Sequence, residues 1–323
     1  MIRDETNDLK WDNRSVFWPS NSGAIPGGSS NLWMCAQDVE TTIWSYFNRI
    51  KKTLSKPSEE PIRLENCSDS LKKILINSLP YRNYSKDLLG ALGSFSQMVA
   101  QTLVLKGCID FEIGVGWNKN SKQPKLEAVN LSYIPAKSLI RIGLQVFQVV
   151  PANANFDKLP ARIIKLDPKR IIRFRLPKKW RHPLAKTRKQ LPLVERSQHL
   201  WMDQLTIRRN REDFKTVTRK YNIQFARITA PIGWNARSLF NEEMANFQSV
   251  TRELQWHKFC VDIQNEILRT TDDVFKRIGQ LYNETPHLIW QYLPTMEQID
   301  DGLQLVINGE AKPYAVLKSL RGY

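Results

Sequence analysis

Residues that build disulfides, metal sites and motif-based active sites are scarce in this sequence. Four cysteines and four histidines occur in 323 residues. The cysteines (Cys35, Cys67, Cys108 and Cys260) are far apart and show no paired spacing. This predicts free thiols in a reducing compartment and argues against a disulfide framework or a zinc site. No two histidines lie three to five residues apart, which excludes a helical metal pair. We expect neither a metal nor a cofactor.

Long uninterrupted apolar runs are also missing. No stretch approaches 18 apolar residues, and Met1 is followed by a charged and polar segment. The sequence therefore predicts no membrane-spanning segment, no membrane partner and no secretory signal. Together with the free thiols, this favours the cytoplasm, or a particle that is assembled in the cytoplasm.

The usual motifs of nucleotide-binding sites are absent as well. Gly114-Val115-Gly116 begins like a dinucleotide loop, but Lys119 stands where the third glycine is required. No glycine-rich loop ending in Lys-Ser or Lys-Thr, which would hold phosphates, is present.

Isolated side chains with catalytic chemistry are better explained by solvation or packing. Asp300, Asp301 and Glu310 have the acidic composition of a nuclease site, but they lie in a terminal helical region, where adjacent acids usually form a solvated face or a cap. His257 falls on an apolar helical stripe and is predicted to be a buried, hydrogen-bonded histidine. The sequence predicts no enzyme, although an active site assembled from distant residues would leave no motif.

What the sequence does contain is a concentrated block of positive charge. Between Lys158 and Arg237 there are 22 lysines and arginines against five acids, a balance of +17, whereas the whole chain carries +16. Such a block must be solvated or meet a polyanion, because burying unpaired charge is very costly. A polyphosphate such as nucleic acid is the usual partner of such a field. An anionic lipid surface, an acidic protein surface and plain solvation are the alternatives.

The pattern of apolar residues predicts an α+β fold, a mixed domain with several short strands followed by long helices. Helices are expected at 36–54, 71–79, 85–106, 194–221, 236–283, 296–307 and 314–320, the long one being continuous or broken at Thr271-Asp272. Strands are expected at 109–115, 126–134, 144–150, 161–166, 171–176 and 223–229, with an exposed basic link between Pro183 and Pro192. Four parts follow: an irregular arm (1–34), an α+β domain (35–177), a basic helical and strand segment (178–235) and a long-helix region with C-terminal helices (236–323).

Three segments of the chain resemble the portal proteins of tailed bacteriophages. The first is a helix that ends LVLKG and runs into the strand CIDFEI, at residues 103–113. The second is LEAVNLSYIP followed by IIKLDPKRIIRFRLP, at 126–135 and 163–177. The third is the C-terminal string from Ile289 through IDDGL to Ile307-Asn308-Gly309-Glu310. The resemblance extends over about residues 85–323.

This resemblance implies a structural, ring-forming protein that provides a DNA passage at one capsid vertex and becomes part of the virion. Its partners would be DNA, further copies of itself in a homo-oligomeric ring, the packaging motor and head–tail connector proteins. The family has no catalytic residues to transfer. The candidates for nucleic-acid binding are Arg173, Arg175, Lys178, Lys179, Arg181, Lys186, Arg188, Lys189, Arg208, Arg209 and Arg211.

Two other functions remain open on the sequence. One is a basic nucleic-acid-binding protein without sequence preference, acting as a monomer or dimer in regulation or defence. The other is an enzyme that processes nucleic acid. Aromatic residues within the basic block would stack on bases in a single-strand binder, but their spacing favours burial. They are Phe174, Trp180, Trp201, Phe214, Tyr221, Phe225 and Trp234.

Overall fold

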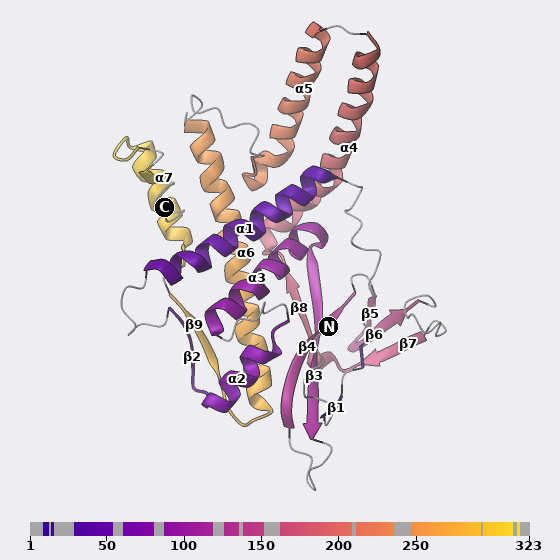
Figure 1. Ribbon diagram of the computed structural model, residues 1–323, viewed down its shortest axis with the longest axis vertical. Helices are drawn as coiled ribbons and strands as arrows, with labels where there is room; N and C mark the ends of the chain where they lie inside the picture. The colour runs from indigo at the N-terminus through magenta and orange to yellow at the C-terminus, as the bar shows by residue number, and fades with distance from the viewer. Residues whose placement is uncertain are drawn as a thin grey trace.

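The computed structural model shows an α+β fold, as the sequence predicted, in which helices pack against one antiparallel sheet (Figure 1). It describes residues 9–12, 14–15, 29–53, 61–80, 87–118, 126–135, 138–151, 162–208, 211–235, 247–291, 293–312 and 315–316. One contiguous apolar core extends from Leu32 to Val316 and includes residues from the long helices and from this sheet. The chain therefore buries residues from both ends of the sequence in the same interior.

The central element of the main sheet is the long strand β3 (Cys108–Asn118), whose interior residues are almost all buried. It pairs antiparallel with β4 (Leu126–Ile134) on one side, and with β8 (Ile171–Arg175) and β1 (Leu9–Trp11) on the other. The residue preceding β3 is Gly107, the left-handed cap of helix α3 with a φ of 87°. This predicted glycine turns the chain directly from helix into strand.

Three helices form the bulk of the core: α1 (Ser30–Thr53), α3 (Leu88–Lys106) and α6 (Phe247–Gln280). Helices α3 and α6 pack against the sheet, and α1 packs on these two helices. The α6 helix runs through 271–272 without a break, so of the two alternatives that the sequence left open the continuous helix is confirmed. Thr271 is fully buried and its hydroxyl donates to the carbonyl of Ile267 one turn earlier, so it continues the helix instead of capping a new one. Residues 236–246, at the start of the predicted helix, lie outside the described part of the chain.

The apolar stripe of α6 is buried within its own chain. Phe259, Ile263, Ile267 and Phe275 are completely inaccessible, since α1, α3, β8 and α7 (Met296–Ile307) pack along the helix. The stripe therefore needs no neighbouring subunit to cover it over the described residues.

Smaller elements complete the body. Helix α2 (Asp69–Ser78) is followed along the chain by α3. Helix α7, near the C-terminal end of the chain, packs against α6. Two strands that the sequence pattern did not predict, β2 (Ile62–Glu65) and β9 (His287–Trp290), pair antiparallel across a long sequence separation. Each has only four residues, too few for a clear alternation. Of the predicted helix at 314–320, only residues 315 and 316 are described, and they are helical.

Helix α3 is the one helix in the described residues that is long and apolar enough to cross a membrane. More than half of this stretch is buried inside the protein. Leu92, Phe95 and Val99 are fully buried in the core, where α3 packs against α1 and β3. Its composition is that of a core helix, surrounded by other elements of the fold.

A second sheet lies beside the body and consists of β5 (Leu139–Ile142), β6 (Gln145–Val150) and β7 (Arg162–Leu166). It shares a separate small core with Ile134 and Ile171. A 3₁₀ turn, η3 (Pro168–Arg170), connects β7 to β8. The two predicted strands around this turn are present, but they belong to different sheets.

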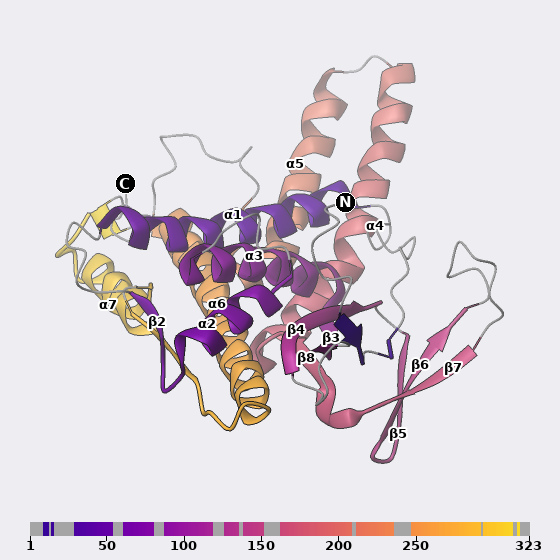
Figure 2. The ribbon, with the colours of Figure 1, turned by 60° about the horizontal axis from the view of Figure 1, so that its bottom comes forward.

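The basic block forms a helical hairpin, with α4 (Lys178–Arg208) and α5 (Arg211–Thr229) rising from the body side by side (Figures 1 and 2). A short 3₁₀ turn, η4 (Ala230–Ile232), closes it. The predicted exposed link between Pro183 and Pro192 is wrong, because both prolines lie inside α4. The predicted strand at 223–229 is also wrong, because these residues end α5.

Packing explains both corrections. An internal proline costs a helix about 3 kcal/mol or more, but the buried positions of α4 keep helical spacing through both prolines. Thr187, fully buried between them, donates its hydroxyl to the carbonyls of Pro183 and Ile228. In α5, the β-branched residues favour a strand locally, yet Phe225 and Thr229 are buried four residues apart, as in a helix.

Candidate nucleic-acid interface

The inner face of α4 fixes the hairpin to the body. Its buried residues recur at helical spacing and lie on one side of the helix: Trp180, Leu184, Thr187, Leu191 and Glu195. The indole N–H of Trp180 donates to the carboxylate of Asp262 in α6 over 2.6 Å, and its ring meets Phe259 edge-on. This face leaves the opposite side of α4 to solvent.

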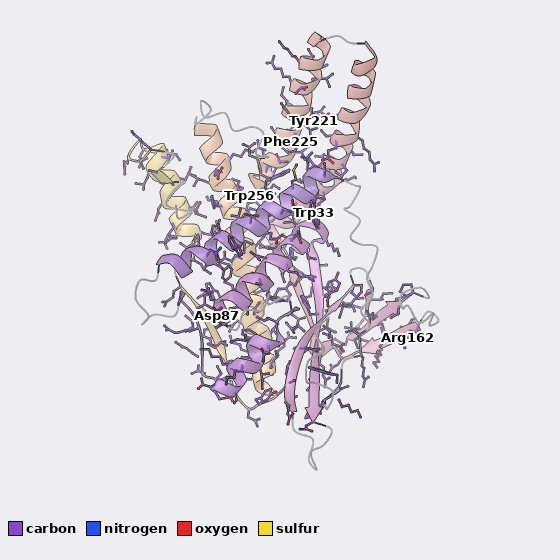
Figure 3. The ribbon with its side chains drawn as sticks, viewed as in Figure 1. Trp33, Asp87, Arg162, Tyr221, Phe225 and Trp256 are labelled. Carbon is purple, nitrogen blue, oxygen red and sulfur yellow. The ribbon has the colours of Figure 1, made fainter. Side chains whose placement is uncertain are left out.

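A polar junction joins the hairpin to the start of α1. Glu195 accepts a hydrogen bond from the backbone N–H of Asn31 over 2.7 Å. The side-chain amide of Asn31 donates to the hydroxyl of Tyr221 in α5 over 3.0 Å. Tyr221 and Phe225 lie where the hairpin meets α1 (Figure 3). Burial raises the pKa of the Tyr221 phenol, which keeps it protonated.

The described outer surface of the hairpin is rich in basic side chains. Among its residues with described side chains (178–198 and 215–229), every exposed charged side chain is basic. These are Lys178, Lys179, Arg181, Lys186, Lys189 and Arg196 in α4, and Lys215, Arg219, Lys220 and Arg227 in α5. Glu195, the acid within these segments, is buried at the junction. From Lys178 to Arg196 the basic surface follows the helix for about 27 Å.

Three of the predicted binding residues lie fully on this surface. Lys178, Lys186 and Lys189 are exposed on the outer side of α4. Lys179 and Arg181 are also exposed, but the ammonium of Lys179 pairs with Asp262 over 2.6 Å, and Arg181 donates to the carbonyl of Leu176. These five side chains lie together at the base of the hairpin.

The two arginines of β8 have different environments. The guanidinium of Arg173 makes a two-point contact with Asp110 of the neighbouring strand β3, with N–O distances of 2.5 and 3.0 Å. The hydrogen bond to this carboxylate raises the pKa of Arg173. Asp110 is only 5% exposed, so the pair serves the sheet. Arg175, two residues later, is exposed.

Arg188 lies on the side of α4 that faces α3. Its guanidinium sits over Gly107 at the C-terminal end of that helix, where helix carbonyls favour positive charge. Burial lowers the pKa of Arg188. Its partial enclosure makes it a contact between α4 and α3. The side chains of Arg208 and Arg211, and all of Arg209, lie outside the described part of the chain.

The aromatic residues of the basic block are mostly interior, as their spacing predicted. Phe174, Trp180, Phe225 and Trp234 are at most 6% exposed, and Tyr221 is partly buried. The side chains of Trp201 and Phe214 lie outside the described part. The described surface of the hairpin therefore offers cations for phosphates, without aromatic faces for stacking on bases.

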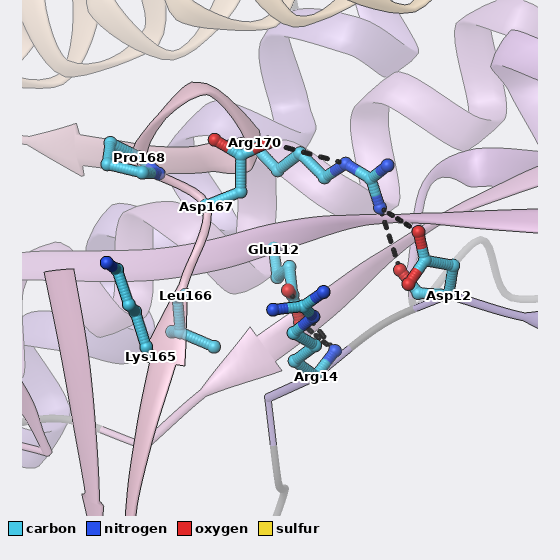
Figure 4. Close-up of a pocket in the computed structure, with 8 residues that line it drawn as sticks. All are labelled: Asp12, Arg14, Glu112, Lys165, Leu166, Asp167, Pro168 and Arg170. Atoms are coloured by element: carbon cyan, nitrogen blue, oxygen red, sulfur yellow. Dashed lines mark hydrogen bonds and ion pairs between the residues drawn. The ribbon is translucent and has the colours of Figure 1, made fainter. Parts of the chain in front are cut away.

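A polar pocket of about 300 Å³ lies beside the N-terminal strand β1 (Figure 4). Arg170 donates to both the carbonyl and the carboxylate of Asp12, over 2.8 and 2.9 Å. Glu112, only 1% exposed, accepts from the backbone N–H groups of Arg14 and Ser15 over 3.1 and 2.7 Å. These bonds tie the N-terminal segment to the rest of the fold: Asp12 is satisfied by Arg170, and Glu112 by backbone N–H groups.

The residues that the sequence offered as catalytic candidates are packed in the core, paired with a neighbouring side chain, or exposed. His257 is 3% exposed, and its Nδ1 lies 2.5 Å from the hydroxyl of Tyr46, as expected for a buried, hydrogen-bonded histidine. Asp300 pairs with Lys258, while Asp301 and Glu310 are exposed. Within the described residues, no three histidine, cysteine or acidic side chains are grouped so as to hold a metal ion.

The chain matches no known protein family, and no curated protein matches it either.

Proposed function

We propose that this protein binds nucleic acid through the basic outer surface of the α4–α5 hairpin and acts as a DNA-handling structural subunit of a portal-like ring. The observation that supports the binding is the uniform sign of exposed charge on the hairpin residues with described side chains (178–198 and 215–229): ten exposed lysines and arginines, with the acid of those segments buried. Contacts of this kind are made to phosphates and carry no sequence information. Binding is then strong at low salt and without sequence preference.

The test is the salt dependence of binding to a DNA duplex. If about six phosphates are neutralised, the logarithm of affinity should fall with the logarithm of salt concentration with a slope of about −5. Replacing Lys178, Lys186 and Lys189 with alanine should weaken binding to all sequences alike and make this slope shallower by about 3.

A matched control removes the same amount of charge elsewhere. Lys10, Lys73 and Lys312 are exposed lysines outside the hairpin. Their triple alanine variant should keep the affinity and slope of the unmodified protein. Equal losses of DNA affinity in both variants would show that only the net charge of the protein matters. An affinity that does not change with salt concentration would contradict the proposal.

The portal-like ring is supported by the resemblance of residues 85–323 to portal proteins and by the placement of the basic charge. The basic hairpin projects from one end of the body (Figures 1 and 2). Identical subunits that meet by unlike surfaces can close into a ring, in which their hairpins would lie around one axis and add their fields. The alternative is a nucleic-acid-binding protein that acts as a monomer or dimer. Mass measurement in solution and negative-stain microscopy separate the two.

A further inference from the structure

We propose that the polar pocket beside β1 binds a phosphate group, as free phosphate or as a phosphate monoester, between the guanidinium of Arg14 and the ammonium of Lys165. This site goes beyond the proposed function. None of the residues that line the pocket belongs to the α4–α5 hairpin, so binding here and binding of nucleic acid by the hairpin can be tested separately.

The pocket lies where separate parts of the chain meet (Figure 4). Its walls come from the N-terminal segment, the central strand β3, the edge strand β7 and the turn η3. Its volume of about 300 Å³ is at the lower end of the range for pockets that hold small molecules. Six of the eight lining residues are charged, three of each sign: Asp12, Arg14, Glu112, Lys165, Asp167 and Arg170. A pocket this small and polar fits a compact, charged ligand.

The three carboxylates of the pocket are already engaged by the protein. Asp12 accepts from the guanidinium of Arg170, and Glu112 accepts from two backbone N–H groups of the N-terminal segment. Asp167 accepts from the backbone N–H of Lys169 over 2.9 Å, which caps the turn η3. The acids therefore hold the walls of the pocket together, and one cation, Arg170, is used in the same way.

The other two cations are not used by the protein. Within the described part of the chain, the guanidinium of Arg14 and the ammonium of Lys165 make no hydrogen bond or ion pair. They stand on either side of the pocket (Figure 4), and both are exposed, so a ligand can reach them. The groups that the pocket still offers to a ligand are cationic, which makes an anion the complementary ligand.

The backbone holds both cations in place. The N–H of Arg14 donates to the buried carboxylate of Glu112, and Lys165 lies opposite Phe147 in the pairing of β7 with β6. The two charges are thus presented from different parts of the fold whose positions are fixed before a ligand arrives. A site that is organised in advance costs less to bind.

A phosphate monoester matches this pair in charge and in hydrogen bonding. It carries about −1.5 to −2 at pH 7 and offers three strong acceptor oxygens. One such group neutralises both cations, and the planar guanidinium of Arg14 can donate two parallel hydrogen bonds to it. A phosphodiester of a nucleic-acid backbone carries one charge and would leave one of the two cations without a partner.

The test is calorimetric titration of the full chain with inorganic phosphate, with glycerol phosphate as a monoester, and with dimethyl phosphate as a diester. The pocket variants are Arg14→Ala and Lys165→Ala. The matched controls are Lys10→Ala and Lys169→Ala, which remove exposed lysines of β1 and η3 that do not line the pocket. Because all four side chains are exposed, every variant should keep the circular dichroism spectrum of the unmodified protein.

The expected result depends on position and on ligand charge. Inorganic phosphate and glycerol phosphate should bind at one site per chain. Each pocket variant should weaken this binding by about tenfold or more, because a charge-assisted hydrogen bond is lost, whereas the controls should stay within about twofold. Dimethyl phosphate should bind the unmodified protein about tenfold more weakly than glycerol phosphate.

Three outcomes would overturn the inference. The first is an unmodified protein that shows no saturable binding of phosphate at millimolar concentration. The second is an equal loss in pocket and control variants, which would mean that only net charge attracts the anion. The third is a diester that binds as tightly as the monoester, which would assign the pocket to a nucleic-acid backbone. DNA binding is measured on the same variants. Its absence from the unmodified protein would contradict the proposed function and leave the phosphate site standing.

Discussion

The carboxylate of Glu195 in α4 accepts a hydrogen bond from the backbone N–H of Asn31, in the first turn of α1, over 2.7 Å. At the same helix terminus, the hydroxyl of Ser29 accepts from the backbone N–H of Leu32 over 3.0 Å. A carboxylate at this position satisfies a backbone donor that the helix leaves unpaired, and it complements the positive end of the helix. Glu195 therefore fastens the hairpin to the body.

Replacing Glu195 with alanine should lower the free energy of unfolding by about 1–3 kcal/mol, because a buried helix terminus loses its acceptor. Glu195→Gln keeps an acceptor oxygen and should cost less. Urea denaturation measures both values. Equal costs for the two substitutions would mean that the negative charge, and not the hydrogen bond, stabilises the junction.

Which parts of the fold could be read from the sequence depends on how local their signals are. The end of α3 at Gly107 and the limits of β4 and α7 were predicted closely, because a glycine cap and a regular apolar period are encoded in neighbouring residues. The short strands β1, β5, β2 and β9 were missed, and the last two pair with each other. Their pairing joins Ile62 to Trp290, a contact that no local pattern contains.

At the candidate interface, too, local features could be predicted from the sequence and contacts between distant residues could not. The concentration of basic residues was plain in the sequence, but their environments were not. Arg173 and Arg188 look like binding residues by charge alone, yet one pairs with Asp110 and the other lies over Gly107. Reading α4 as broken at its prolines also hid the helical spacing that puts Arg196 on the basic surface.

The two arginines of β8 allow the stability contribution of a paired arginine to be compared with that of an exposed one. Arg173→Ala removes the partner of a buried carboxylate and should lower the free energy of unfolding by about 2–4 kcal/mol. Arg175→Ala, on an exposed side chain, should change it by no more than about 0.5 kcal/mol. Chemical denaturation of both variants provides the comparison. If Arg173→Ala leaves the free energy of unfolding unchanged, Asp110 must find another partner in the variant.

Asp272 links stability to pH. It accepts hydrogen bonds from the backbone N–H of Leu288 at 2.7 Å, the ammonium of Lys276 at 2.6 Å and the imidazole of His287 at 3.1 Å. Burial by itself raises the pKa of this carboxyl, but the three hydrogen bonds outweigh it and lower the pKa below its ordinary value of 3.8.

A carboxyl with a lowered pKa in the folded state stabilises the protein above its unfolded pKa. That contribution is lost as the pH falls through the folded value. Asp272→Asn should therefore destabilise the protein most above about pH 4, by roughly 1–3 kcal/mol, and the difference from the unmodified protein should shrink at lower pH. Urea denaturation at a series of pH values measures this difference. A difference independent of pH would show that the ionisation of Asp272 does not contribute to stability.

The last prediction concerns the turn between α3 and β3, where two constraints coincide. Gly107 has a φ of 87°, a left-handed conformation that costs other residues about 1–2 kcal/mol. A Cβ at this position would also lie 2.9 Å from Nη1 of Arg188. Gly107→Ala should therefore destabilise the protein by more than the backbone conformation alone explains.

Gly309 is the matched control for this substitution. Its φ is 74°, also left-handed, but no atom lies within 4 Å of where its Cβ would be. Gly309→Ala should cost only the backbone strain, and the excess at Gly107 measures the crowding by Arg188. Shortening the arginine, as in Arg188→Ala, should remove that excess when combined with Gly107→Ala, since the two effects share one contact. Thermal denaturation of the single and double variants gives the coupling. Purely additive effects would mean that the guanidinium moves aside freely and does not hold α4 against the end of α3.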